Sequence, residues 1–213
     1  MFPLKDDNPT ETKPFLTIFL IVINVAIFIY SLLSGSFEEI IYDYGMKPKT
    51  LIAEPYTLFT SMFLHGGFLH IIGNMWYLWI FGDNIEDICG RRRFLLLYVL
   101  SGVAAGLIHA LSDPKSAVPT VGASGAIAGI LGAYAVLYPR AKVYTAVVIF
   151  YFIQIIMVPA LFLLGFWFIL QLLSASITWI AGAQTGVAYW AHVGGFVAGA
   201  VLIWPLKKRR RRY

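Results

Sequence analysis

Four polar residues in this sequence have the types and spacing needed for serine-based catalysis. Ser124 follows a polar loop and opens an apolar segment within the glycine-rich residues 122–129. A serine there lies at a helix N-terminus, whose partial positive charge and free N–H groups stabilise a developing oxyanion. His192, in the last apolar segment, is the candidate base. His70 and Asn74 are four residues apart on one helix face, and both can donate hydrogen bonds to an oxyanion.

The residues around these four also have a purely structural interpretation. His70 and Asn74 can serve as hydrogen-bonding contacts between helices. A Ser–His hydrogen bond of about 3 Å requires the backbones of the two helices to approach closely. Packed membrane helices show the same close approach, so packing and catalysis remain alternatives at this point. Small residues at helical spacing follow both Ser124 and His192, namely Gly125, Gly129, Gly132, Gly194, Gly195 and Gly199.

The elements that carry these residues belong to a membrane protein. The 213 residues are 59% hydrophobic and 13% charged, with a mean hydropathy of +0.76. This composition excludes an ordinary soluble domain and indicates a polytopic protein embedded in a lipid bilayer. The single Cys89 excludes an intramolecular disulfide, and we expect neither a metal site nor a cofactor.

The net charge of +5 is concentrated in two clusters, residues 91–93 and the tail at residues 207–212. A basic tail can bind nucleic acid. Directly after a membrane span it more often indicates anchoring against anionic lipid, so we expect no nucleic-acid partner. The positive-inside rule places both clusters, together with Arg140 and Lys142, in the cytoplasm.

The predicted fold class is all-α, a polytopic membrane helical bundle of six transmembrane helices with both termini cytoplasmic. We expect a loose cytoplasmic tail over residues 1–14, a membrane domain over residues 15–204 and a basic cytoplasmic tail over residues 205–213. A charge-rich turn is expected over residues 82–93, with Glu86 in a structural role. Its turn glycines are Gly82 and Gly90. The predicted spans are residues 15–33, 65–81, 94–111, 124–138, 160–176 and 189–204.

The apolar stretch over residues 143–180 has room for one span or two, with Pro159 in its middle. A second crossing would put the basic tail outside, so we assign one span after Pro159. Residues 143–158 are then expected to form an interfacial or re-entrant segment on the cytoplasmic side. The loop over residues 34–55 mixes acidic and apolar residues and is expected to fold onto the membrane surface.

Counting along the helices places three polar sites at one depth. At a rise of 1.5 Å per residue, Ser124, His192 and His70 lie roughly 24, 22 and 20 Å from the cytoplasmic edge, in the outer half of the bilayer. Polar residues inside spans are functional candidates by default. Hydrolysis consumes water, so we expect a wet cavity open to the outer face, with a lid over residues 34–57 and 176–188. No carboxylate within the spans can orient His192, which predicts a Ser–His dyad.

The chain resembles the rhomboid intramembrane serine proteases of the compact six-span bacterial type. The resemblance covers about residues 57–204 and rests on four motifs: HGGFLHIIGNM at 65–75, FGDNIED at 81–87, GASG at 122–125 and AHVGG at 191–195. It implies that Ser124 is the nucleophile and His192 the general base. It also implies that His70, Asn74 and the N–H of Ser124 form the oxyanion hole. The implied substrates are transmembrane proteins whose helix unwinds into the site, and the implied location is a bacterial inner (plasma) membrane.

The sequence departs from the family's pattern at two positions. Well-studied members carry a Trp-Arg pair in the first loop near residues 56–57, and this pair is absent here. That leaves open how the loop is anchored. Some members stack a tyrosine one turn after the serine onto the histidine, but Ala128 occupies that position, so another side chain must hold His192.

Two other classes of function compete with the protease. A catalytically silent relative would bind membrane clients without cleaving them, but such proteins usually lack the serine or the histidine, and both are retained here. A transporter or channel would place charged residues within the spans, and none occurs in the predicted spans. The sequence leaves the substrate, the cleavage site and the oligomeric state open.

Overall fold

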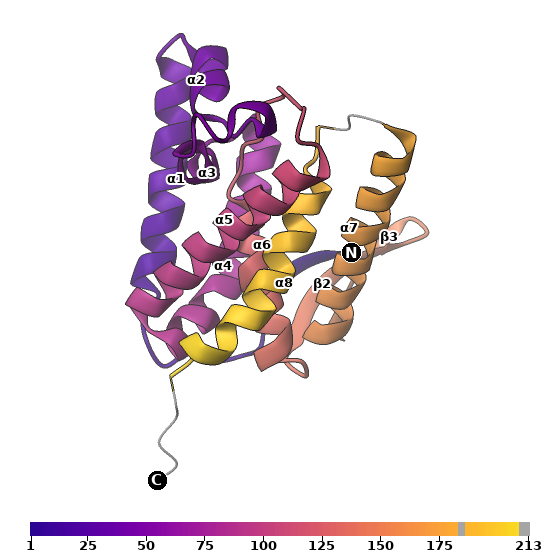
Figure 1. Ribbon diagram of the computed structural model, residues 1–213. Helices are drawn as coiled ribbons and strands as arrows, with labels where there is room; N and C mark the ends of the chain where they lie inside the picture. The colour runs from indigo at the N-terminus through magenta and orange to yellow at the C-terminus, as the bar shows by residue number, and fades with distance from the viewer. Residues whose placement is uncertain (183–185, 209–213) are drawn as a thin grey trace.

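The computed structural model describes residues 1–182 and 186–208. It is a helical bundle with a small β-sheet at one side (Figure 1). Two single turns of 3₁₀-helix, Pro48–Thr50 and Ser61–Phe63, lie in the first loop and before α4. The helices are α1 (Phe15–Leu33), α2 (Phe37–Tyr44), α3 (Thr57–Thr60), α4 (Phe68–Cys89), α5 (Arg91–Ser112), α6 (Ser124–Leu137), α7 (Ala160–Ala181) and α8 (Tyr189–Leu206), and the strands are β1 (Phe2–Asp6), β2 (Lys142–Ile149) and β3 (Phe152–Pro159).

Four of these helices, α1, α5, α7 and α8, are long and apolar enough to cross a membrane. Helix α6 is apolar but has only 14 residues. Helix α4 is 22 residues long and carries polar side chains such as His70, Asn74 and Asp83 along its length. The chain is therefore a multi-pass membrane helical bundle, with four helices that qualify as spans by length and composition among the described residues.

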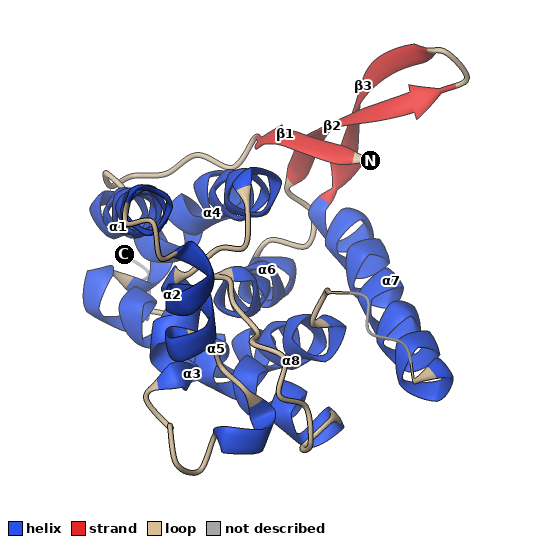
Figure 2. Cartoon of the chain, turned by 90° about the horizontal axis from the view of Figure 1, so that it is seen from above, coloured by secondary structure: helices blue, strands red, loops and turns tan. Residues whose placement is uncertain are grey.

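Helix α6 lies in the middle of the bundle, surrounded by α4, α5 and α8 in Figure 2. Every residue from Gly125 to Ala135 is buried. A Cβ added to Gly199 of α8 would overlap the carbonyl oxygen of Gly129, and one added to Gly195 would overlap that of Gly125. Glycine is required at these contacts because the two backbones touch. The packing role predicted for these glycines is confirmed.

The predicted turn over residues 82–93 is wrong, because α4 continues to Cys89 and α5 begins at Arg91. Gly82 is helical, and a Cβ there would lie 2.9 Å from the Cγ2 of Thr17. Only Gly90 makes the turn, with φ of +72°. The polar residues that resembled a turn are paired with the N-terminal segment instead, which allows the helix to continue.

The structural role predicted for Glu86 is confirmed. Its carboxylate accepts hydrogen bonds from the N–H of Leu16 (3.0 Å) and from the N–H (2.8 Å) and Oγ1 (2.9 Å) of Thr17. These N–H groups belong to the first turn of α1, which has no hydrogen-bonding cap from its own Pro14. A side chain from α4 therefore caps α1 from a distance of about 70 residues in sequence.

Residues 1–14 do not form a loose tail. Strand β1 pairs with β2 antiparallel, from Phe2 opposite Ala146 to Asp6 opposite Val143. Further along, the N–H groups of Glu11 and Thr12 donate to the carboxylate of Asp87. The segment is thus bound to the sheet and to α4 along most of its length.

The all-α prediction is also wrong in one part, because residues 142–159 form a β-hairpin that gives a three-stranded sheet in the order β1-β2-β3. The hairpin occupies the position expected for an interfacial or re-entrant segment. Its runs of β-branched and aromatic residues favour strands over helix. Apolarity alone does not distinguish a short buried helix from a strand, which is why hydropathy missed it.

The first loop is attached to the protein despite lacking the Trp-Arg pair. Met46 is 1% exposed and forms a β-bridge with Thr120. The neighbouring Lys47 donates to the carbonyl of Tyr42 at 2.8 Å and pairs with Glu54 at 3.4 Å. The Met46–Thr120 bridge fastens the loop to the segment that leads into α6, and the Lys47 contacts hold the loop's own fold together.

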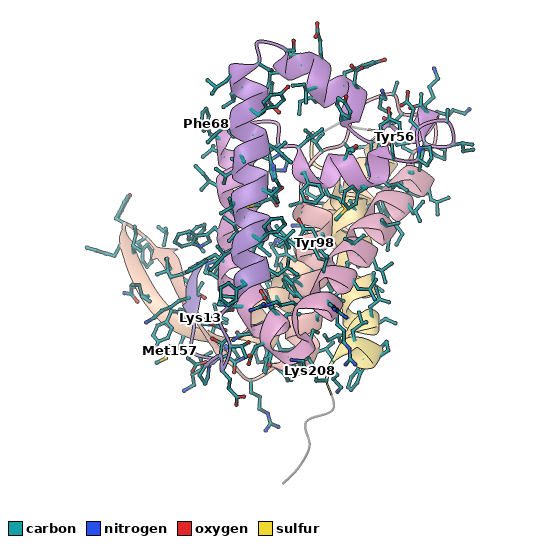
Figure 3. All side chains as sticks on the ribbon, turned by 90° about the vertical axis from the view of Figure 1, so that its left-hand side faces the viewer. Lys13, Tyr56, Phe68, Tyr98, Met157 and Lys208 are labelled. Atoms are coloured by element: carbon teal, nitrogen blue, oxygen red, sulfur yellow. The ribbon has the colours of Figure 1, made fainter. Side chains whose placement is uncertain are left out.

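One end of the helical bundle can be recognised from hydrogen bonds between distant segments. The N–H of Lys208, after α8, donates to the carbonyl of Ile88 at 3.0 Å, beside the α4 residue that caps α1. The N–H of Ala160, at the start of α7, donates to the carbonyl of Ala141. The start of α1 and the end of α8 therefore lie at one end, where Figure 3 labels Lys13 and Lys208.

Candidate active site

Ser124 and His192 lie within hydrogen-bond distance of each other. Ser124 is the first residue of α6, and its Oγ lies 2.9 Å from Nε2 of His192, in the first turn of α8. The approach depends on the glycine contacts between α6 and α8 described above, because larger residues would separate the helices. The structure thus brings together two residues that are 68 positions apart in the sequence.

The other ring nitrogen of His192 meets an amide from α7. Nδ1 lies 2.8 Å from Oε1 of Gln171. An amide oxygen only accepts hydrogen bonds, so Nδ1 carries the proton and Nε2 is free to accept one from Ser124. This is the tautomer that a general base for the serine requires.

Trp167, one helical turn before Gln171, packs on the same imidazole. The two ring centroids are 5.9 Å apart and the ring planes are inclined by 33°. Helix α7 therefore supplies both the hydrogen bond and the aromatic contact that hold His192. Trp167 thus supplies the aromatic contact with His192 that α6 lacks, because Ala128 stands where some family members carry a tyrosine.

His70, on α4, lies beside Gly122, two residues before Ser124. The N–H of Gly66 points to Nδ1 of His70 at 3.4 Å, so Nδ1 is the acceptor and Nε2 carries the proton. A Cβ added to Gly122 would lie 2.6 Å from His70 Nε2 and 3.6 Å from the Oγ of Ser124. The space next to Gly122 is therefore within reach of a nitrogen donor and of the serine oxygen at once.

Asn74 lies one turn further along α4 and is 7% exposed. Its Nδ2 is buried and has no hydrogen-bond partner among the described residues. A buried amide donor without a partner is costly unless a bound group accepts from it. Asn74 lines the same cavity as Ser124, so its donor is accessible to a group bound there.

His65 lies behind His70 and outside this set. It is 1% exposed, and its ring packs edge-on against that of His70 at 5.2 Å. This ring contact supports the position of His70.

The four predicted residues all line one cavity of about 1300 Å³. The predicted lid contributes Met46 from residues 34–57, and Gly182 and Gly186 from residues 176–188; residues 183–185 lie outside the described part of the chain. Loop residues 112–120, which the sequence did not single out as a lid, also line it. The cavity lies toward the end of the bundle where α6 begins.

Sequence reasoning missed Gln171 and Trp167. Gln171 carried a usable signal, because it is a polar side chain within a predicted apolar span and such residues are functional candidates. Trp167 carried none, since an aromatic residue in an apolar helix is ordinary. Only the crossing of α7 past the start of α8 reveals its role.

Comparison with known proteins identifies the family. The Rhomboid domain family matches residues 53–209. The chain belongs to the rhomboid family. This confirms the family resemblance deduced from the four motifs, and the family includes named proteases as well as inactive members.

The chain is similar to proteins from a yeast, a bacterium and a plant. Rhomboid protein 1, mitochondrial, of Saccharomyces cerevisiae is 31% identical over 207 residues, which cover 91% of this chain and 55% of that protein. Rhomboid protease GluP of Bacillus subtilis is 34% identical over 125 residues, or 57% of this chain and 24% of that protein. Rhomboid-like protein 11, chloroplastic, of Arabidopsis thaliana is 34% identical over 158 residues, or 72% of this chain and 53% of that protein.

The chain spans only about half the length of the yeast relative and about a quarter of the Bacillus one. The activity and substrates of this chain therefore do not follow from these matches. The relatives include mitochondrial and chloroplastic proteins, so the expected bacterial inner membrane is not supported, whereas a multi-pass membrane location is.

Proposed function

We propose that this rhomboid chain is an intramembrane serine endopeptidase that cleaves transmembrane segments of membrane proteins. The observation that carries the proposal is the hydrogen-bonded series Ser124–His192–Gln171 at the wall of a cavity within a helical bundle. A packing role for Ser124 and His192 explains their proximity, but it does not explain an unpaired donor on Asn74 facing the same cavity.

In this mechanism, the Oγ of Ser124 attacks the scissile carbonyl carbon while Nε2 of His192 takes the hydroxyl proton. Gln171 accepts from Nδ1–H throughout and stabilises the imidazolium that forms. His192 then gives its proton to the leaving amine, which leaves an acyl-serine. A water molecule, deprotonated by His192, hydrolyses the acyl group and restores the serine.

Hydrogen-bond donors on α4 and α6 stabilise the oxyanion. Nε2–H of His70, Nδ2–H of Asn74 and the N–H of Ser124 surround the space where negative charge develops on the carbonyl oxygen. Donors fixed in advance at this place lower the barrier, since they need no reorganisation during the reaction. The positive end of α6, which begins at Ser124, adds to the same field.

The six-span topology belongs to the same proposal. Helices α4 and α6 complete the four apolar spans, residues 15–204 form the membrane domain, and both ends of the chain lie in the cytoplasm because the basic clusters gather at that end. The cavity then opens toward the outer face, which gives water and an unwound substrate segment access to Ser124.

A serine-directed fluorophosphonate, applied to the protein in detergent, tests the proposal. We expect covalent labelling of Ser124, identified by mass spectrometry of the labelled peptide. Labelling should be lost in Ser124→Ala and in His192→Ala, because the hydroxyl is then absent or unactivated. A single-span substrate should be cleaved by the wild type and not by Ser124→Ala.

Two outcomes would contradict this. Equal labelling of the wild type and His192→Ala would remove the dyad from the mechanism. Stable binding of the single-span protein without cleavage, together with no labelling, would assign the chain to the catalytically silent members that bind membrane clients.

A further inference from the structure

The hairpin formed by β2 and β3 has exposed apolar side chains on both of its faces. No Asp, Glu, Lys or Arg occurs between Lys142 and Lys207. A strand pair in water normally presents at least one polar face. The apolar side chains of the hairpin that are more than half exposed are Val148, Phe150, Tyr151, Phe152, Ile153, Ile155 and Met157.

The hairpin leaves the bundle sideways, next to α7. Figure 2 shows it reaching away from the helices, and Figure 3 shows it inclined beside the bundle with Met157 near its base. Strand β3 leads directly into α7, whose Leu161 and Phe162 are 51% and 71% exposed. The apolar surface of the hairpin is therefore continuous with the side of a membrane helix that faces lipid.

The tip of the hairpin keeps an aromatic residue where the backbone disfavours one. Phe150 has φ of +54°, a left-handed conformation that glycine or asparagine adopts more easily. Its side chain is 88% exposed and the adjacent Tyr151 is 96% exposed. The tight two-residue turn between Ile149 and Phe152 accounts for this backbone conformation, and an uncovered aromatic ring occupies the position where glycine or asparagine is usual.

The base of the hairpin has a different character. Lys5, Arg140 and Lys142 are exposed there, and Lys5 lies over the ring of Tyr144 at 4.9 Å. Asp7, at the same level, accepts a hydrogen bond from the N–H of Lys142. Basic and tyrosine side chains at the base with apolar rings at the tip follow the order of a membrane boundary, from headgroups to acyl chains.

We propose that residues 147–157 are inserted into the bilayer leaflet at which α7 begins, with the rings of Phe150 and Tyr151 among the acyl chains. Insertion is shallow, because the outer edge of β3 has no strand neighbour among the described residues. Its backbone groups need hydrogen bonds that water and lipid headgroups provide and the hydrocarbon core does not. The partner of this surface is the lipid itself.

The insertion would attach the bilayer to two helices that border the cavity. Strand β3 continues into α7, while β1 contacts α4 through the Nε1–H of Trp76, which donates to the carbonyl of Pro3 at 2.7 Å. The sheet therefore bridges α4 and α7 and extends into the lipid beside them. The inserted hairpin contains none of the proposed catalytic residues, so its insertion does not depend on the proposed function.

Spin labels read by collision with oxygen and with a water-soluble nickel chelate test the insertion. The label is placed at Tyr151→Cys in a Cys89→Ala background, and the protein is reconstituted in phosphatidylcholine–phosphatidylglycerol vesicles. Phe162→Cys on α7 is the lipid-facing control, and Glu38→Cys on α2 is the water-facing one. A repeat at Ile153→Cys shows whether the strand behaves as the tip does.

We expect the label at position 151 to match position 162, with a ratio of oxygen to nickel accessibility several-fold higher than at position 38. A ratio like that at position 38 would place the tip in water and overturn the proposal. Protection from both reagents at positions 151 and 153 would also overturn it, because a protein surface, such as a second copy of this chain, would then cover the hairpin.

Discussion

The tautomer of His192 is set by an amide where many serine proteases use a carboxylate. Gln171 accepts from Nδ1 at 2.8 Å, which leaves Nε2 facing Ser124 at 2.9 Å. A carboxylate would add a full charge to a bundle with few polar neighbours, at a high desolvation cost. The neutral amide orients the ring without that cost, and it stabilises the imidazolium less strongly.

Replacing Gln171 by Ala should slow fluorophosphonate labelling of Ser124 roughly 10- to 150-fold, because a hydrogen bond to a charged group contributes about 1.5–3 kcal/mol. The rate is measured by time-resolved labelling across pH, since a changed orientation of His192 also alters the pH profile. Ser176→Ala is the control, because this half-buried serine lies on the same helix and its hydroxyl donates to the carbonyl of Leu172. An unchanged rate and profile in Gln171→Ala would reduce Gln171 to a packing residue.

Removing one oxyanion donor should lower turnover while the protein stays folded. His70→Ala or Asn74→Ala is expected to cost on the order of 3 kcal/mol in the barrier, or about a hundredfold in rate. Cleavage of a single-span substrate gives the rate, and thermal unfolding checks the fold. If both variants cleave at the wild-type rate, the two side chains belong to helix packing.

The four candidate residues could be found from the sequence because each is polar within an apolar segment and because counting placed three of them at one depth. The support around them could not be found in this way. Gln171 passes the same polarity test, but only the geometry connects its amide with a ring 21 positions later. Trp167 has no sequence signal that separates it from ordinary apolar residues of α7.

The contact between α6 and α8 depends on glycine. Gly199→Ala should destabilise the protein by at least about 1–3 kcal/mol, because its methyl group would overlap the backbone of Gly129. Gly165→Ala on α7 is the matched control, since a Cβ there meets nothing within 4 Å. Thermal unfolding in detergent compares the two, and an equal midpoint in both variants would contradict the backbone contact.

Hydropathy predicts where apolar helices lie, but it does not predict where tertiary contacts extend a helix or favour a strand. Residues 15–33 match α1 at both ends, and α6 ends one residue before the prediction. Helix α4 runs eight residues past its predicted end, because Asn84, Glu86 and Asp87 find partners in residues 8–17. Whether residues 143–158 were strand or helix was beyond the reach of apolarity alone.

At the scale of the whole molecule, the two ends of the chain should lie on one side of the membrane. The N–H of Lys208 meets the carbonyl of Ile88, and Arg93 Nη1 lies 3.5 Å from the carbonyl of Leu206, beside the turn that follows the cap of α1. Reporter fusions after residue 213 and within residues 112–120 should give opposite sidedness. The same sidedness at both positions would contradict the three crossings that α6, α7 and α8 make between the loop and the tail.

The pairing of β1 with β2 has a consequence for the order in which the protein is made. Residues 2–6 pair with residues 143–146, which leave the ribosome about 140 residues later. At about 5–20 residues per second, that is a delay of roughly 7–28 s. Residues 11–17 find Glu86 and Asp87 much sooner, so α1 and α4 close first. A ribosome that pauses before residue 143 leaves residues 2–6 without their strand partner for as long as the pause lasts.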